Sequence, residues 1–225
     1  ISSLGRILIT RILHLQSAGI YEIGRKLPNM GLMLPGAIAG TLMPAASHLE
    51  GSSQQQRLKR LYLASTRYLM MLSSIPYAFL ILFARQIIET WVGTGFDESV
   101  YVMQILAAGT FINLFTGIGT ACARGIGKPK YEIQYMTLST LLIVATAVPL
   151  IHRLGIAGGA WAYSIGQTVG SVYFLWRSNR LFEVTWPRFL QKVLPPVVMM
   201  FGMGLPVKML CNFLWLAEEP SRWPK

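Results

Sequence analysis

The sequence predicts an all-α fold, a polytopic bundle of helices that cross a membrane. Of the 225 residues, 53% are hydrophobic and only 13% are charged, whereas about a quarter of the residues of a soluble domain are charged. Apolar stretches long enough to cross a bilayer recur along the chain, and basic residues gather in alternate loops between them. These observations exclude a soluble globular domain, and the high hydrophobicity excludes a disordered chain.

The predicted spans are charge-free stretches of about 17 to 25 residues, the length that a helix needs to cross a hydrocarbon core. They must be helical because lipid offers no partner for unpaired backbone groups, and a transmembrane barrel would show short alternating segments instead. The last of them is interrupted only by Lys208. The spans are Leu27–Leu49, Tyr68–Ala84, Ser99–Ala123, Ile133–Ile151, Leu154–Trp176 and Val193–Leu216.

Loop charges predict the orientation of these spans. Basic-rich loops alternate with loops that contain a single basic residue, Arg85 or Arg153. By the positive-inside rule the basic-rich loops face the cytoplasm. Arg25 and Lys26 fall on the opposite side, in what we expect to be a short loop. The basic-rich loops hold Arg57, Lys59, Arg60 and Arg67, then Arg124, Lys128 and Lys130, then Arg177, Arg180, Arg188 and Lys192.

The segment before the first full span combines apolar residues with three ionisable ones. In a helix over Leu4–Ile20, Arg6, Thr10, His14 and Arg11 share one polar stripe about 140° wide. Such a helix either lies flat at the membrane interface or crosses the membrane with its stripe facing a wet interior.

Arg6 and Arg11 are the strongest candidate site residues, because charged groups at membrane depth face a cavity or a partner. The planar guanidinium of arginine suits a phosphate, although Arg6 also lies where its side chain could extend to the lipid headgroups. His14 is a weaker candidate. Asn113 and Gln104, inside a predicted span, could bond sugar hydroxyls, although such residues more often join helices to one another.

Two further patterns predict how the spans pack and bend. Small residues repeat every four positions in one span, which favours close approach of another helix: Gly158, Ala162, Gly166 and Gly170. Prolines interrupt the first full span and predict bends, whether as hinges or as static kinks: Pro28, Pro35 and Pro44.

Signatures of enzymes are missing from the sequence. It contains no HExxH motif, Walker loop or GxSxG motif, and Cys122 and Cys211 have no metal-ligand spacing. We therefore expect no catalytic residue, no metal and no cofactor, and we expect no carboxylate deep in any span. The net charge of +11 is explained by loops that set topology, so nucleic acid is not an expected partner.

Four short motifs occur in order along the chain. Ala18–Tyr21 leading to Lys26–Pro28 resembles a G-x-Y…K/R-L turn, and Ile88–Gly93 is similar to an I-x-x-W-x-G loop. Gly127–Lys130 and Leu154–Ala160 resemble the pair G-K/R-P-K and G-I-x-G-A-A. In this order the motifs resemble those of polysaccharide exporters in the MOP superfamily of multidrug, oligosaccharidyl-lipid and polysaccharide flippases, over roughly residues 1–180.

Members of this family have two similar six-helix lobes around a central cavity and work by alternating access. The resemblance therefore implies that residues 1–180 form the second, C-terminal lobe. Residues 181–225 would add a cytoplasmic linker, one further transmembrane helix and a short tail. On this interpretation the chain is the C-terminal half of a longer protein, and the N-terminal lobe of the same protein is its partner.

The resemblance also implies a function: a flippase for undecaprenyl-diphosphate-linked oligosaccharide, in O-antigen or exopolysaccharide assembly, in the bacterial inner membrane. Arg11, with Arg6, would neutralise the diphosphate, while Asn113, Gln104 and His14 would meet the sugar. Other expected partners are membrane lipids, a polysaccharide polymerase and glycosyltransferases. Two alternatives stay open: a cation-coupled multidrug exporter of the same superfamily, and a membrane-embedded transferase acting on lipid-linked sugars.

Overall fold

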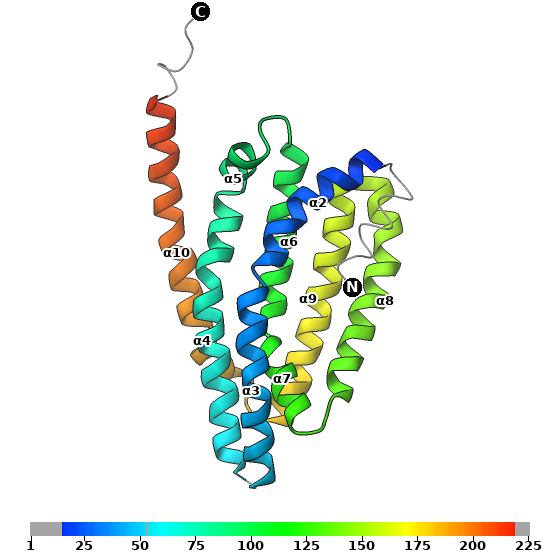
Figure 1. Cartoon of the computed structure of the whole chain (residues 1–225), viewed down its shortest axis with the longest axis vertical. Helices are drawn as coiled ribbons and strands as arrows, with labels where there is room; N and C mark the ends of the chain where they lie inside the picture. Colours follow the sequence, from blue (N-terminus) through cyan, green and yellow to red (C-terminus); the bar gives the residue numbers. More distant parts are fainter. Residues whose placement is uncertain (1–14, 53, 219–225) are drawn as a thin grey trace, which may run out of the picture.

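A computed structural model of the chain describes residues 15–52 and 54–218, which form long helices joined by short turns, with no strand among them (Figure 1). The prediction of an all-α bundle is confirmed. The helices are α2 (Leu15–Met30), α3 (Met33–Gly51), α4 (Gln55–Leu82), α5 (Ala84–Trp91), α6 (Asp97–Leu114), α7 (Gly117–Gly125), α8 (Lys130–Leu154), α9 (Ile156–Leu181) and α10 (Trp186–Glu218).

The long helices run side by side, so that the bundle has two distinct ends (Figure 1). The connections α3–α4, α7–α8 and α9–α10 meet at one end, which carries the basic-rich loops and is called the basic end below. The start of α2, the short helix α5 and the turn between α8 and α9 lie at the other, the α5 end (Figure 1). Helix α10 lies at the edge of the bundle and packs along α4.

Several described helices are long and apolar enough to cross a membrane. Three continuous helical stretches qualify: 97–125, 130–154 and 186–209. Two bent pairs raise the number to five if each pair is one span: α2 with α3, bent by 41°, and α4 with α5, bent by 73°. The composition and the fold together make the chain a multi-pass membrane protein.

The tightest contact in the bundle joins α8 to α9. At Gly158, Gly166 and Gly170 an added Cβ would collide with α8, at Leu150, Ile143 and Ser139 respectively. Gly155, with φ of 59°, provides the left-handed residue that turns the chain directly from one helix into the other. The predicted small-residue face is confirmed, and we call this contact the glycine seam.

Helix α2 corrects the expected loop around Arg25 and Lys26. The helix is continuous from Leu15 to Met30, so the charged residues lie inside it and the turn predicted after Tyr21 is absent. A run of charges predicts a break between spans, but a helix tolerates charges if they share one face. The break comes later, at Gly31 and Leu32.

The bend between α2 and α3 has an identifiable cause. Pro28 lies in the last turn of α2, where it removes one backbone donor. The Leu32 amide donates to the Asn29 carbonyl, 3.1 Å away, rather than to the Pro28 carbonyl that a regular helix would use. The Tyr77 hydroxyl of α4 donates to that carbonyl instead, at 2.8 Å.

Buried aromatic rings tie α10 to the bundle at the basic end. Tyr62 of α4 is fully buried and stacks on Phe182 and Phe189, with ring centroids 4.7 and 6.1 Å away. Its hydroxyl donates to Asn179 Oδ1 of α9, 3.0 Å away. The connection from α9 to α10 is therefore part of the packed core.

Candidate functional site

An open groove of about 600 Å³ lies beside α2, toward the α5 end. It combines charged, polar and apolar side chains from three helices, and we call it the α2 groove. Its lining residues are Glu22, Ile23, Arg25, Lys26, Asn29, Met30, Met33 and Trp91.

The polar residues of the α2 groove come from one side of an amphipathic helix. The opposite side of α2 is fixed on α6: an added Cβ at Gly24 would lie 2.7 Å from the Ser99 carbonyl oxygen, and the Ser99 hydroxyl donates to the Ile20 carbonyl at 2.8 Å. Because residues three, four and seven apart share a helix face, the polar ones form a stripe about 100° wide. This stripe is Glu22, Arg25, Lys26 and Asn29.

The charges of this stripe are unequally available. Arg25 Nη2 donates to Glu22 Oε2 at 2.8 Å, and the two side chains are 17% and 31% exposed. Each largely cancels the charge of the other, while Glu22 Oε1 is buried without a hydrogen-bond partner. Lys26 is exposed, and its Nζ lies 5.5 Å from the centre of the Trp91 ring. The positive charge presented by the groove is therefore that of Lys26.

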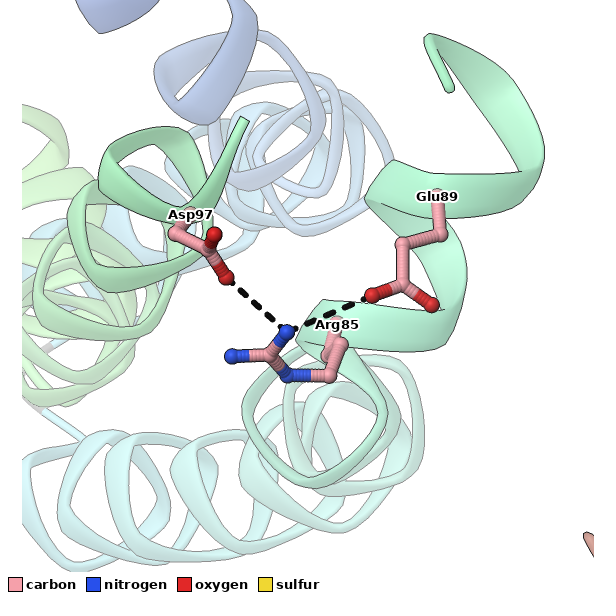
Figure 2. Close-up of polar contacts among 3 residues, drawn as sticks. All are labelled: Arg85, Glu89 and Asp97. Atoms are coloured by element: carbon pink, nitrogen blue, oxygen red, sulfur yellow. Dashed lines mark hydrogen bonds and ion pairs between the residues drawn. The ribbon is translucent and has the colours of Figure 1, made fainter. Parts of the chain in front are cut away.

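Trp91 reaches the groove because α5 turns away from α4 and is held at the start of α6. Arg85 Nη1 donates to Asp97 Oδ1 at 2.9 Å and to Glu89 Oε1 at 3.3 Å, as Figure 2 shows. Asp97, and to a lesser extent Glu89, raise the pKa of Arg85 above its ordinary value. With α5 held in this way, Trp91 stays about half exposed beside α2.

The strongest candidates from the sequence are not among these residues. Arg6, Arg11 and His14 lie outside the described residues, and their contact with a diphosphate or a sugar stays a prediction.

Asn113 and Gln104 lie on opposite sides of α6. They are nine residues apart, which corresponds to about two and a half turns of an α-helix. Gln104 Nε2 donates to the Ile81 carbonyl at the end of α4, 3.1 Å away. Asn113 Nδ2 lies within 3.2 to 3.4 Å of oxygen atoms of Tyr135, Gln167 and Ser171. Both amides thus join helices in this structure, neither lines the α2 groove, and a contact with sugar stays a prediction.

The sequence contained a signal for the α2 groove that the predicted loop obscured. The spacing of residues 22, 25, 26 and 29 is that of one helix face. Glu22 lies about two turns inside α2, and if the bent pair α2–α3 is one span, this carboxylate lies within it, contrary to the expectation of no carboxylate deep in a span. No local pattern indicates that Trp91 would face this stripe, since α5 follows a 73° bend.

Two solved transporters share this fold. One is a MOP superfamily transporter from Pyrococcus furiosus Vc1 (DSM3638), described as having a binding pocket of reverse polarity that suggests a different function. It has 16% sequence identity and a TM-score of 0.69, over 91% of this chain and 47% of its own. The other is a multidrug resistance MATE family transporter of the MOP superfamily in an inward-facing conformation. It has 19% identity and a TM-score of 0.53, over 90% of this chain and 55% of its own.

The chain therefore has the fold of the MOP superfamily transporters, and it spans about half the length of the two that it matches. Residues 1–101 match the family model described as polysaccharide biosynthesis protein. The resemblance seen in the sequence is thus confirmed as a resemblance, by the fold over most of the chain and by the family model over residues 1–101. No curated protein matches the chain.

Proposed function

We propose that the chain is the second lobe of a bacterial inner-membrane transporter that moves lipid-linked oligosaccharides by alternating access. Residues 1–180 would form this lobe with a first lobe of the same protein, and residues 181–225 would add the linker and the extra helix. The matched family model, a polysaccharide biosynthesis protein, supports a glycan-linked substrate. The α2 groove, in which an unpaired cation and an exposed aromatic ring face open space within a bent span, is the observation that carries the proposal.

The chemistry of the groove suits a sugar linked to a diphosphate. Lys26 offers an ammonium group without a carboxylate partner among the described residues, and such a group attracts phosphate. The exposed ring of Trp91 can pack against the apolar face of a sugar ring. Asn29 supplies amide donors and an acceptor for hydroxyl groups. Arg6 and Arg11, as predicted from the sequence, would add positive charge to the same cavity.

Glu22 favours a second candidate function, a cation-coupled multidrug exporter. A carboxylate inside a span, with one oxygen unpartnered, is the kind of group that takes up a cation. The Arg25 guanidinium already binds the other carboxylate oxygen of Glu22, so it would compete with a coupling cation for this carboxylate. For that reason the oligosaccharide transporter is the preferred proposal.

Replacing Lys26 by Ala in the natural gene tests the proposal. We expect surface polysaccharide to fall about tenfold or more, because one charge contact to phosphate is lost, while the amount of protein in the membrane is unchanged. Lys26→Arg should retain most of the activity. Arg153→Ala is the matched control, since it removes one exposed positive charge at the same end of the bundle and should leave polysaccharide unchanged.

Normal polysaccharide in the Lys26→Ala strain, with the protein present, would contradict the assignment of the groove. Glu22→Gln separates the two candidate functions. A strain that keeps its polysaccharide but becomes sensitive to cationic drugs would identify the exporter.

A further inference from the structure

A second group of charged residues lies at the basic end, on α8 and α9, far along the bundle from the α2 groove. Three cations are packed on two aromatic rings. Arg180 Cζ lies 4.1 Å from the centre of the Trp176 ring, Arg177 Cζ lies 5.1 Å from that of Tyr131, and Lys130 Nζ lies 5.5 Å from that of Tyr131. We call these five residues the cation–aromatic cluster.

The cations of this cluster have no acidic partner within the described part of the chain. The nearest carboxylate in sequence, Glu132, pairs with Arg124 at 3.2 Å, and no ion pair involves Lys130, Arg177 or Arg180. Arg177 Nε is in addition buried without a hydrogen-bond partner. Aromatic rings hold cations in place but do not neutralise their positive charge. The charge of the cluster is therefore not balanced by any carboxylate among the described residues.

An apolar groove lies about two turns farther along α9 from the cluster. It has a volume of about 380 Å³, lies between α6 and α9, and exposes almost no polar surface. Val172 lies between the groove and Trp176 and is half exposed. By the helical repeat, one face of α9 carries residues 161, 165, 168, 169, 172, 176 and 180. The lining residues of the groove are Ile105, Ala108, Gly109, Ile112, Trp161, Ser164, Ile165, Thr168 and Val169.

We propose that this face of α9 binds one phospholipid with an anionic headgroup, from the leaflet at the basic end. The lipid phosphate would lie on Arg177 and Arg180, whose planar guanidinium groups suit its oxygens, with Lys130 beside them. One acyl chain would run past Val172, with its end at the near end of the α6–α9 groove, beside Val169.

From Arg180 to Val169, the near end of the groove, the rise along the helix is about 16 Å. This is close to half of the hydrocarbon core of a bilayer, so the end of an acyl chain from this leaflet would reach the near end of the groove. Trp176 and Tyr131 then lie at the level where aromatic residues meet headgroups. Arg180 lies on the same face of α9 as the apolar groove, and Arg177 lies about 60° away, where it packs on Tyr131 of α8. Basic side chains above an apolar groove are complementary to an anionic amphiphile, whereas the ammonium group of a zwitterionic lipid offsets the charge of its phosphate.

Binding of dioleoyl phosphatidylglycerol to the delipidated, full natural protein tests the proposal, with dioleoyl phosphatidylcholine as the reference lipid and native mass spectrometry as the measurement. The wild-type protein should prefer phosphatidylglycerol by about tenfold or more, since each basic residue of the cluster adds to the attraction for an anionic headgroup. The double variant Arg177→Ala with Arg180→Ala should lose this preference.

The matched control is Arg57→Ala with Arg60→Ala, which removes two exposed arginines at the same end, on α4, and should keep the preference. Ala108→Phe tests the groove separately, because Ala108 is exposed and lines it. That variant should weaken dioleoyl phosphatidylglycerol several-fold and leave dihexanoyl phosphatidylglycerol unchanged.

Equal binding of the two headgroups, or equal loss in the cluster and control variants, would overturn the proposal. Competition by glycerol 3-phosphate as strong as that by the lipid would show a site for a free phosphate compound instead. A change of oligomeric state in the cluster variant, with lipid binding intact, would show that a protein covers this face. These residues are separate from Lys26, so either proposal can fail alone.

Discussion

The glycine seam between α8 and α9 and the bend between α2 and α3 are opposite solutions to packing a helix in this bundle. In the seam, glycines bring two backbones so close that a single added carbon collides. In the bend, the helix is interrupted, and the Pro28 carbonyl accepts a hydrogen bond from the Tyr77 side chain of α4. Polar residues of α2 face the open groove there. The seam leaves no room for a ligand, whereas the bend borders an open groove.

This difference indicates how the lobe divides its tasks. Close glycine packing fixes α8 and α9 as one unit, and the amide of Asn113 adds hydrogen bonds from α6 to both helices. The helix pair α2–α3, by contrast, is a bent junction whose charged residues line an open groove. We therefore expect substitutions in the seam to affect stability and substitutions at the bend to affect transport.

The largest effect should come from Gly170→Leu in the seam. A leucine there would drive into Ser139 and the backbone of α8, and overpacking of this kind costs about 3 kcal/mol or more when backbone must move. Thermal unfolding of the purified protein should show the loss. Gly36→Leu on α3 is the control, because nothing lies within 4 Å of its added carbon, and equal destabilisation by both would contradict the contrast.

A smaller effect is expected from Tyr77→Phe at the bend. Without the hydroxyl, the Pro28 carbonyl loses its donor in apolar surroundings, which costs about 1 to 3 kcal/mol. Spin labels at positions 19 and 47, both exposed, should report a broader distance distribution across the bend. Tyr68→Phe, a change at an exposed tyrosine of the same helix, should leave that distribution narrow. An unchanged distribution in Tyr77→Phe would show that the bend does not depend on this bond.

The smallest effect should follow Arg85→Ala. Its ion pairs with Asp97 and Glu89 are exposed, and exposed pairs contribute little to stability because water and salt screen them. We expect an unchanged unfolding temperature. The indole fluorescence of Trp91 should shift if Arg85 holds α5 in place. Strong destabilisation would show that α5 is a structural part of the bundle rather than an edge of the groove.

The seam could be predicted from the sequence because its signal is local. Glycine and alanine at steps of four lie on one helix face whatever surrounds the helix, and the colliding Cβ positions at Gly158, Gly166 and Gly170 match that pattern. Apolar length likewise predicted the spans that became α6 with α7 and α8.

The bend and its groove could not be predicted in the same way. Glu22, Arg25 and Lys26 have a helical spacing, but charge density alone favours a loop, and only packing on α6 through Gly24 shows that the charges share an outward face. The donor for the Pro28 carbonyl comes from Tyr77, 49 residues away. A contact of such sequence separation leaves no trace in local periodicity.

The continuous path from Leu15 through the bend to Gly51 has a consequence for how the protein is seated in its bilayer. A straight α-helix over this stretch would be about 55 Å long, which is much longer than a hydrocarbon core of about 30 Å. Tilting absorbs part of such an excess, and the 41° change of direction absorbs more. We expect the remainder to emerge into water at the basic end, because the last turn of α3 carries the polar residues His48 and Glu50. A thicker membrane would therefore be expected to draw these last turns inward and straighten the helix, which couples the shape of the groove to the lipids around it.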